Sequence, residues 1–402
     1  MKKILLIVAI IIILAAAGFF VFWKVSGTLE VSFNVNASVT PTPRPLPEKL
    51  KNPPVTIKGI YATSWTAGTE KSIDYLIDLI KKTELNAIVI DIKDYTGYIS
   101  FDTELPFIKN LGTEKIQIKN FNDLIDKLHQ NNIYVIARIS VFQDPALTLK
   151  RPDLAIKSKK TGAIWKDRNG ISWLDPASPE VWNYILTIAK EVNRRGVDEL
   201  NFDYIRFPSD GDMQDLAYPF YDEKTPKKEV LREFFQYLSD NLRPQGVRLS
   251  ADLFGLTIVN PDDLGIGQVL EDAAPYFDFI CPMVYPSHYA SGFLGYKNPA
   301  EYPYEVIKYS LEAGKKRLMA MTATPTPKPN ATSTPSILPT PKFTKVAELR
   351  PWLQDFDMGA VYNEAMVRLE KKAVSDTGLS AGWLFWDPKN VYTVSAFDLE
   401  QK

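Results

Sequence analysis

The stretch GVDELNFDYIRFPSD, residues 196–210, predicts the central strand of this protein. Its apolar residues form a run bounded by Gly196 and Pro208, which is typical of a buried strand. Asp203 and Arg206 stand at the predicted C-terminal end of the strand, where a carboxylate beside a guanidinium suits charge-stabilising chemistry. A purely structural Asp203–Arg206 ion pair is the alternative interpretation.

Strand-like and helix-like segments alternate on both sides of this stretch. The predicted strands are 57–63, 86–93, 133–142, the stretch that begins at 196, 247–254, 278–285, 348–353 and 381–385. The predicted helices are 70–82, 121–131, 179–195, 226–242, 264–276, 302–315 and 362–374. Eight strands joined by helical crossovers predict the α/β class and a closed (β/α)8 TIM barrel. An open doubly wound sheet is the rival, but its usual glycine-rich turn is missing after the first strand.

The amino terminus predicts a signal anchor, a transmembrane helix over residues 1–24. Residues 4–23 are an unbroken apolar run of about one bilayer thickness, and two lysines precede it. A cleaved signal peptide is the alternative, but bulky residues 19–23 occupy the place where a cleavage site needs small ones. We therefore expect a single-pass protein of the cell membrane with its main domain extracytoplasmic.

Two segments rich in Pro and Thr divide the rest of the chain. Residues 36–54 predict an extended linker, and residues 55–402 predict the barrel domain. A low-complexity segment at 324–342 interrupts that domain. We interpret it as a surface insert, because the sequence after it has too few elements to fold alone. An interdomain linker is the alternative.

Composition excludes several classes of function. The formal net charge is −1 and no long basic block is present, so nothing indicates nucleic-acid binding. Cys281 is the only cysteine, which rules out an intrachain disulfide. With two histidines and no HExxH pattern, the sequence predicts no metal site and no cofactor. The oligomeric state does not follow from the sequence.

Polar and aromatic residues gather at the predicted C-terminal ends of the strands. From the first strand to the eighth these are Tyr61, Ser64 and Trp65; Asp91, Lys93, Asp94 and Tyr95; Arg138, Ser140 and Gln143; Asp203 and Arg206; Asp252; Met283 and Tyr285; Arg350, Trp352, Gln354 and Asp355; and Trp383, Trp386 and Asp387. A loop cap or an interstrand ion pair explains each residue alone. Their coincidence on one rim of a barrel predicts a functional site.

Paired carboxylates within a bowl of Trp and Tyr side chains predict glycosidase chemistry. Asp203 and Asp252 lie on adjacent predicted strands at matching depth, so we expect them to be the catalytic pair. Neighbouring strands are roughly 5 Å apart, which allows the separation of about 5–5.5 Å that retaining enzymes use. Asp91 and Asp355 are reserve candidates for the acid. The predicted substrate-binding residues are Asp91, Lys93, Arg206, Tyr285, Trp352, Gln354, Trp386 and Trp65.

Three motifs, NFDYIRFP (201–208), LRPWLQDF (349–356) and GWLFWDP (382–388), resemble the bacterial "putative glycosyl hydrolase" domain family, domain of unknown function 4015. The resemblance covers about residues 57–392 and implies a TIM barrel with carbohydrate activity. The proline-rich insert departs from the family pattern but falls between barrel elements.

A fainter resemblance is to chitinase-type barrels. Asp198, Asn201 and Asp203 are spaced like the Asp-rich fourth strand of that family, and residues 283–285 are similar to its Met-x-Tyr. The general-acid glutamate of the family falls at Ile205, so the chain departs from the chitinase scheme. We therefore expect two aspartates to act, with Asp203 as nucleophile or base and Asp252 as acid.

Together these features predict a membrane-anchored extracellular glycoside hydrolase whose partner is a cell-envelope or environmental polysaccharide. A barrel that binds envelope glycan without cleaving it is the alternative, because no glutamate stands at the fourth, fifth or seventh strand end.

Overall fold

The structure is a computed structural model that describes residues 45–323 and 343–400. Its centre is a closed barrel of parallel strands, in which β1 pairs with β2 on one side and with β13 on the other. The barrel strands are β1 (Ile57–Ala62), β2 (Ala87–Lys93), β5 (Tyr134–Ser140), β7 (Glu199–Asp203), β9 (Arg248–Phe254), β10 (Phe279–Met283), the pair β11 (Glu348–Leu349) and β12 (Trp352–Gln354), and β13 (Gly382–Trp386). The predicted eight-stranded barrel is confirmed.

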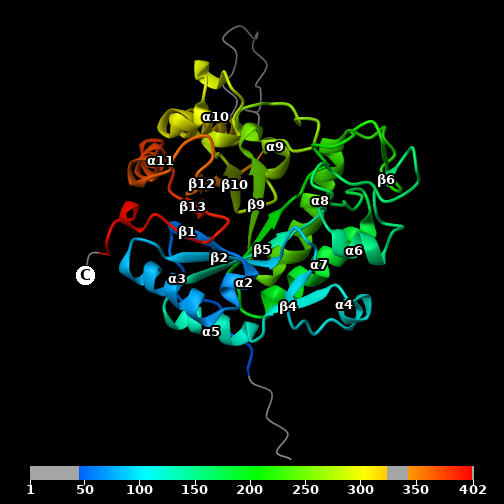
Figure 1. Ribbon diagram of the computed structural model, residues 1–402, viewed down its shortest axis with the longest axis horizontal. Coiled ribbons are helices and arrows are strands. Elements are labelled where there is room, and N and C mark those ends of the chain that lie inside the picture. The colour runs from blue at the N-terminus through cyan, green and yellow to red at the C-terminus, as the bar shows by residue number, and fades with distance from the viewer. Residues whose placement is uncertain (1–44, 324–342, 401–402) are drawn as a thin grey trace, which may run out of the picture. The chain divides into compact units, whose positions relative to one another are not determined.

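Helices surround the strands, as Figure 1 shows. They are α2 (Ser64–Ala67), α3 (Glu70–Lys82), α4 (Pro106–Leu111), α5 (Phe121–Gln130), α6 (Pro145–Lys150), α7 (Pro179–Arg194), α8 (Lys227–Leu242), α9 (Leu270–Ala273), α10 (Pro303–Thr322) and α11 (Glu364–Asp376). On α3, for example, Ile73, Leu76 and Ile80 follow the helical period and are buried, so one apolar stripe packs on the barrel.

Three local differences from the predicted elements have physical causes. The helix predicted at 264–276 is only α9, because Leu264, Gly265 and Gly267 adopt positive φ angles that a helix cannot contain. The helix predicted at 302–315 continues to Thr322. The seventh strand is split into β11 and β12 around Pro351, which has no N–H for a ladder.

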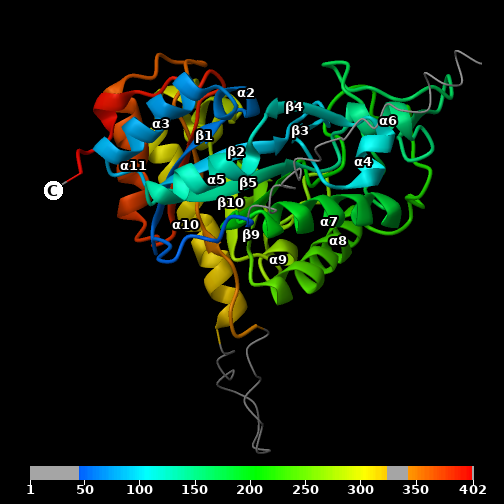
Figure 2. The same ribbon diagram turned by 90° about the horizontal axis from the view of Figure 1, so that it is seen from below.

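Two excursions from the barrel were not predicted. Between β2 and α5 the chain forms β3 (Ile99–Phe101), α4 and β4 (Glu114–Ile118), and β3 pairs antiparallel with β2. After β5 a long loop carries α6 and β6 (Lys157–Ser158), and β6 pairs with β8 (Leu216–Ala217) from the loop after β7. Figure 2 shows β3, β4, α4 and α6 on one side of the barrel.

The segment that enters the barrel packs against the amino-terminal end of β7. Leu50 N donates a hydrogen bond of 2.8 Å to Asp198 Oδ1, and the Glu48 carbonyl lies 2.8 Å from His129 Nδ1. Gly196 has a φ of 88°, and a Cβ there would lie 2.4 Å from the Pro47 carbonyl oxygen. Residues 47–50 of the predicted linker therefore contact the barrel, and the compact unit includes residues from Leu46 onward.

Two predicted segments lie outside the described residues. They are the anchor at 1–24 and the insert at 324–342. Within 45–323 and 343–400, no helix is both long and apolar enough to cross a bilayer. The insert joins α10 to β11, and β11 pairs with β10 of the same barrel.

A buried polar ladder fills the middle of the barrel. Glu199 and Arg350 are fully buried and form an ion pair, with Arg350 Nη1 3.1 Å from Glu199 Oε2. Ser250 Oγ donates to Glu199 Oε1 at 2.5 Å, and Asn201 Nδ2 donates to Ser250 Oγ at 3.0 Å. Asn201 Nδ2 also donates to Asp252 Oδ1 at 2.8 Å. The ladder thus ends at a carboxylate near the C-terminal ends of the strands.

Candidate active site

Three carboxylates from three strands converge on one arginine. Arg138 of β5 donates from Nη1 to Asp91 Oδ1 at 2.6 Å and from Nη2 to Asp203 Oδ2. Its Nε lies 3.6 Å from Asp252 Oδ2. The strands β2, β5, β7 and β9 are consecutive neighbours, and inward-facing positions at matching depth bring these side chains together.

Asp252 occupies an environment that favours its protonated form. The residue is 1% exposed, and its Oδ1 accepts hydrogen bonds of 2.8 Å from both Asn201 Nδ2 and Trp352 Nε1. Burial and the nearby Asp203 carboxylate together raise the pKa of Asp252 to about 8, against the opposing effect of Arg138. At neutral pH this side chain is a carboxylic acid whose Oδ2 is available to carry the proton.

Asp203 is held as the charged partner of Arg138. Its Oδ1 accepts a 2.6 Å hydrogen bond from the backbone N–H of Tyr204, and its Oδ2 accepts a hydrogen bond from Arg138 Nη2. Tyr204 has a φ of 51°, so the strand ends there and the chain turns away. The two aspartates therefore differ. Asp203 binds an arginine and a backbone N–H, whereas Asp252 has a raised pKa.

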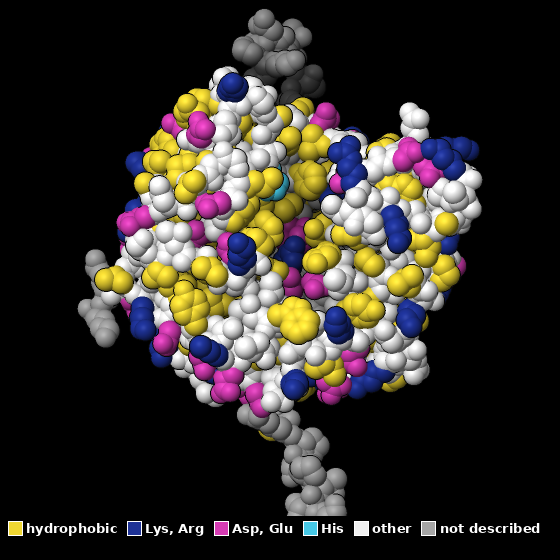
Figure 3. Space-filling view, in the orientation of Figure 1, with side chains coloured by type: hydrophobic (Ala, Val, Ile, Leu, Met, Phe, Trp, Pro, Cys, Tyr) yellow, Lys and Arg dark blue, Asp and Glu magenta, His cyan; other side chains and the backbone are white. Residues whose placement is uncertain are grey.

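A cavity of about 450 Å³ opens above these carboxylates. Asp203, Asp252 and Arg138 line it together with aromatic side chains. The aromatic lining comprises Tyr204, Phe254, Tyr285, Tyr289, Trp352 and Trp386. The rings of Tyr285 and Trp386 lie 5.6 Å apart. Figure 3 shows charged side chains at the bottom of a hollow that is bordered by hydrophobic ones.

Comparison with known proteins agrees with this geometry. The model of a family described as "Putative glycosyl hydrolase domain" matches residues 59–392. The chain belongs to that family. No curated protein matches it in sequence.

Solved structures with the same architecture include glycoside hydrolases. A hypothetical protein from Ruminiclostridium thermocellum ATCC 27405 is 37% identical over 52% of this chain and 98% of its own, with a TM-score of 0.44. The PgaB (BpsB) glycoside hydrolase domain from Bordetella bronchiseptica is 13% identical over 86% of this chain and 100% of its own, with a TM-score of 0.56. An α-L-fucosidase from Paenibacillus thiaminolyticus is 10% identical over 85% of this chain and 48% of its own, with a TM-score of 0.50. At such identities the last two support the fold alone.

The structure brings together most of the predicted site residues of this glycosyl hydrolase family member. Asp203, Asp252, Arg206, Tyr285, Trp352 and Trp386 all line the cavity. Asp91 lies behind them on Arg138 and accepts a hydrogen bond from the Tyr61 hydroxyl. Burial raises the pKa of Asp91, while Arg138 and Tyr61 oppose the rise. Asp91 therefore contacts Arg138 rather than the cavity.

Three predicted substrate-binding residues lie elsewhere. Lys93 is fully buried in an ion pair, with Nζ 2.9 Å from Asp144 Oδ2. Gln354 is also fully buried, and its Oε1 accepts a 2.8 Å hydrogen bond from Ser287 Oγ. Trp65 is 61% exposed and is not part of the cavity lining. Lys93 and Gln354 thus stabilise loops, because their functional groups are satisfied inside the protein.

The predicted Asp203–Arg206 pair does not form. Arg138 holds Asp203 instead, and Arg206 stacks on aromatic rings in the loop beyond the strand. The reserve acid Asp355 accepts hydrogen bonds from Thr393 N and Oγ1 at 2.8 and 2.7 Å and does not line the cavity. Burial raises the pKa of Asp355 to about 6.

Two residues of the site, Arg138 and Asn201, are absent from the predicted catalytic and substrate-binding residues. Arg138 is among the residues at the C-terminal end of the third predicted strand, between the strands that carry Asp91 and Asp203, and this neighbouring position is the sequence signal for its role. Asn201 gave a weaker signal, a polar residue two positions before Asp203 on the same inward face. Both donate hydrogen bonds to the carboxylates, and Arg138 also lines the cavity.

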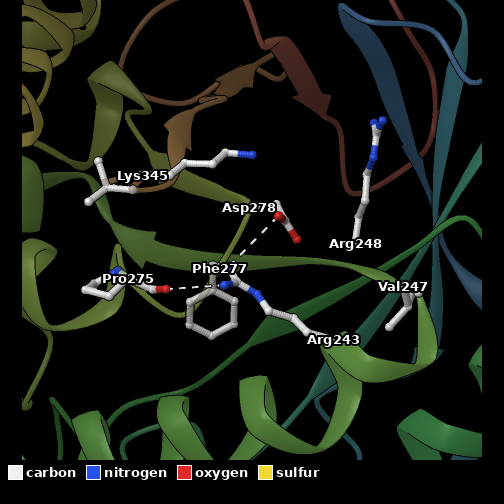
Figure 4. A pocket seen from close by; sticks show the side chains of 9 residues that line it. Arg243, Val247, Arg248, Pro275, Phe277, Asp278 and Lys345 are labelled. Atoms are coloured by element: carbon white, nitrogen blue, oxygen red, sulfur yellow. Dashed lines mark hydrogen bonds and ion pairs between the residues drawn. The ribbon is translucent and has the colours of Figure 1, made fainter. Parts of the chain in front are cut away.

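A different cavity, of about 350 Å³, lies at the opposite end of the barrel strands. Arg243, Arg248, Asp278 and Lys345 are among its lining residues, and Figure 4 shows Arg243 directed toward Asp278 and the Pro275 carbonyl. Arg243 Nη2 lies 3.9 Å from Asp278 Oδ1. Because TIM-barrel chemistry collects at the C-terminal ends of the strands, we assign the active site to the cavity above Asp203 and Asp252.

Proposed function

We propose that this protein is a glycoside hydrolase in which Asp252 is the general acid and Asp203 is the nucleophile or base. One observation carries the proposal: two aspartates in one cavity have opposite environments, one with a pKa of about 8 and one paired with Arg138. Two carboxyl groups in different protonation states are what hydrolysis of a glycosidic bond needs.

The chemistry follows from the hydrogen-bond partners of each carboxyl group. Asp252 Oδ2 donates its proton to the leaving glycosidic oxygen, since Oδ1 already accepts two N–H groups. Asp203 then attacks the anomeric carbon or removes a proton from the attacking water. Arg138 holds Asp203 in an ion pair, which fixes the position of this carboxylate. The rings of Tyr285 and Trp386 supply flat apolar surface for the sugar.

We also propose a substrate class and a cellular location for this protein. The substrate is a cell-envelope or environmental polysaccharide, and residues 1–24 anchor the chain in the cell membrane with the barrel extracytoplasmic. The apolar run and the lysines before it support this location. Alkaline carbonate extraction of membranes tests it: the full chain should remain in the pellet, and release into the supernatant would contradict the anchor.

One observation favours a second function, the binding of glycan without cleavage. Both oxygens of Asp203 are engaged, one by Tyr204 N and one by Arg138, so neither is free before substrate enters. In that alternative the cavity retains a sugar chain through its aromatic lining.

A screen of the full chain against envelope polysaccharides, read by newly formed reducing ends, separates the two functions. For a hydrolase, Asp203→Asn and Asp252→Asn should each lower turnover by about a thousandfold or more while glycan retention persists. The matched control is Asp78→Asn on α3, whose side chain is 67% exposed and does not line the cavity. Normal turnover by Asp203→Asn would overturn the mechanism, and retention without turnover in the wild type would establish the binding function.

A further inference from the structure

The loop after β7 places a guanidinium with an unused hydrogen-bonding edge at the cavity. Arg206 is only 8% exposed and lines the cavity beside Asp203 and Phe254. Its Nη1 donates to the Phe207 carbonyl at 3.1 Å and to Ser209 Oγ at 3.0 Å. Among the described residues, no acceptor bonds to its Nε or Nη2 and no carboxylate forms an ion pair with it.

This arginine differs from the other buried ones in the described chain. Arg195 pairs with Glu191, and Arg350 pairs with Glu199. The carboxylates of Asp203, Asp210 and Asp167 act on Arg206 only through longer-range electrostatics. A buried cation without a partner costs free energy, so its retention beside a cavity indicates a ligand that supplies the missing charge.

Aromatic rings surround the Arg206 guanidinium group. Its Cζ lies 4.7 Å from the ring centroid of Trp173 and 4.7 Å from that of Phe254, with Tyr204 at 5.6 Å. Phe254 lies two residues after Asp252 on β9, on the same face of the strand. The rings contact the guanidinium group, and its Nε and Nη2 atoms have no acceptor among the described residues, so they remain for a ligand.

The free edge has the geometry that this chain uses elsewhere for a carboxylate. Arg317 donates from Nε to Glu271 Oε1 at 2.7 Å and from Nη2 to Glu271 Oε2. Those are the two nitrogens that are unused on Arg206. A planar carboxylate fits this fork with two parallel hydrogen bonds, which an uncharged hydroxymethyl group cannot match.

We propose that Arg206 binds the carboxylate of an acidic sugar, so that the glycan held in the cavity contains uronic acid residues. The inference rests on the proposed function in that a glycan occupies this cavity. It adds that the sugar beside Asp252 carries a carboxylate, whose two oxygens accept from Nε and Nη2 of Arg206.

The experiment uses the full chain in affinity electrophoresis through gels that contain polygalacturonate, alginate or hyaluronan. Each polymer is paired with its carboxyl-reduced form, and reducing ends are measured in parallel. At least one acidic polymer should retain the wild type at least tenfold more strongly than its carboxyl-reduced form. Arg206→Gln should remove that difference, because it removes both the charge and the fork.

Two further variants separate recognition from folding. Arg206→Lys keeps the charge without the fork and should lose most of the retention. Arg206→Met keeps apolar contact with the two rings, so it should match the wild type in thermal midpoint while it loses retention. The matched control is Arg243→Gln at the opposite end of the barrel (Figure 4), which should retain the wild-type mobility shift.

The outcomes distinguish this inference from the proposed function. Arg206-dependent retention without turnover of any polymer would support the acidic subsite and overturn the hydrolase. Turnover of a neutral glycan, with equal behaviour of wild type and Arg206→Gln on every acidic and reduced pair, would support the hydrolase and overturn the subsite. Absence of retention by all three acidic polymers would also overturn the subsite.

Discussion

The indole N–H of Trp352 donates a hydrogen bond of 2.8 Å to Oδ1 of Asp252. Asn201 Nδ2 donates to the same oxygen at 2.8 Å. Two donors on Oδ1 fix the orientation of the carboxyl group and leave Oδ2 for the proton. The tryptophan therefore orients the acid in addition to lining the cavity.

Turnover should fall as the pH rises through about 8, because Asp252 must be protonated to act as an acid. The raised pKa also affects folding. Between pH 4 and 8 the folded state binds more protons than the unfolded one, so the free energy of unfolding decreases with rising pH. The contribution is at most about 1.4 kcal/mol per pH unit. Asp252→Asn should lack this decrease, which urea unfolding at pH 5 and pH 8 would measure. An identical pH dependence in the variant would contradict the raised pKa.

Trp352→Phe should move the basic limb of the pH profile to higher pH. The substitution keeps an aromatic ring but removes the N–H that stabilises ionised Asp252, so the pKa of that carboxyl rises. We expect kcat/KM to fall about tenfold through loss of orientation. The control is Trp383→Phe, a buried tryptophan of β13 that does not contact Asp252. A basic limb that stays in place would show that the indole N–H does not tune the acid.

Arg138→Gln should damage both folding and turnover, because Asp91 and Asp203 would lose their common partner. Removal of one member of a buried ion pair costs about 3–5 kcal/mol. Arg138→Lys should retain more stability but still lower kcat/KM, since a single ammonium cannot serve both carboxylates with a planar fork. Chemical denaturation and kcat/KM from pH 4 to 9 would test both effects. An unchanged kcat/KM in the lysine variant would show that turnover does not need the planar fork of Arg138.

The buried pair of Glu199 and Arg350 should be structural. Arg350→Met alone leaves Glu199 charged and unpaired, and we expect a loss of about 3–5 kcal/mol in the free energy of unfolding. Adding Glu199→Gln should restore at least half of that loss, because the remaining buried charge disappears. A urea double-mutant cycle gives the coupling energy. Additive losses would mean that the two side chains do not depend on each other.

Removal of residues 46–52 should destabilise the barrel. A chain that starts at residue 53 lacks the hydrogen bond from Leu50 N to Asp198. It also lacks the packing of the Leu50 side chain against the hydrophobic cluster inside the barrel. Compared with a chain that starts at residue 46, we expect a loss of about 1–3 kcal/mol. Differential scanning calorimetry of the two chains would measure it. Equal melting temperatures of the two chains would show that residues 46–52 do not stabilise the barrel and would support a domain boundary at residue 54.

The sequence predicted the pairing of Asp203 with Asp252 because strand order and the two-residue period fix which residues face inward at one depth. It did not predict that Arg138 holds Asp203. The apolar Ile205 suggested that the strand continues to Arg206, whereas Tyr204 takes a left-handed φ and ends it. A left-handed φ is uncommon at a tyrosine, so the residue type at position 204 does not predict the end of the strand.

Burial at the strand ends was equally hard to predict. Lys93 and Gln354 occupy strand-end positions that normally face an active site, but each is covered by a loop distant in sequence. Asp144 forms an ion pair with Lys93, and Ser287 Oγ donates a hydrogen bond to Gln354 Oε1. Such partners depend on the path of irregular loops, and strand periodicity carries no information on that path.

Closure of the barrel by β1 and β13 also sets an order of events during synthesis. Asp91, Arg138, Asp203 and Asp252 have all been translated by residue 252, yet the strand that completes the ring ends at Trp386. The ribosome must therefore add more than a hundred residues after the last of these charged residues before the barrel around them can close. The ribosome releases a competent site only after the final strand has emerged, and chains truncated before it carry the acids without the enclosure that raises the pKa of Asp252.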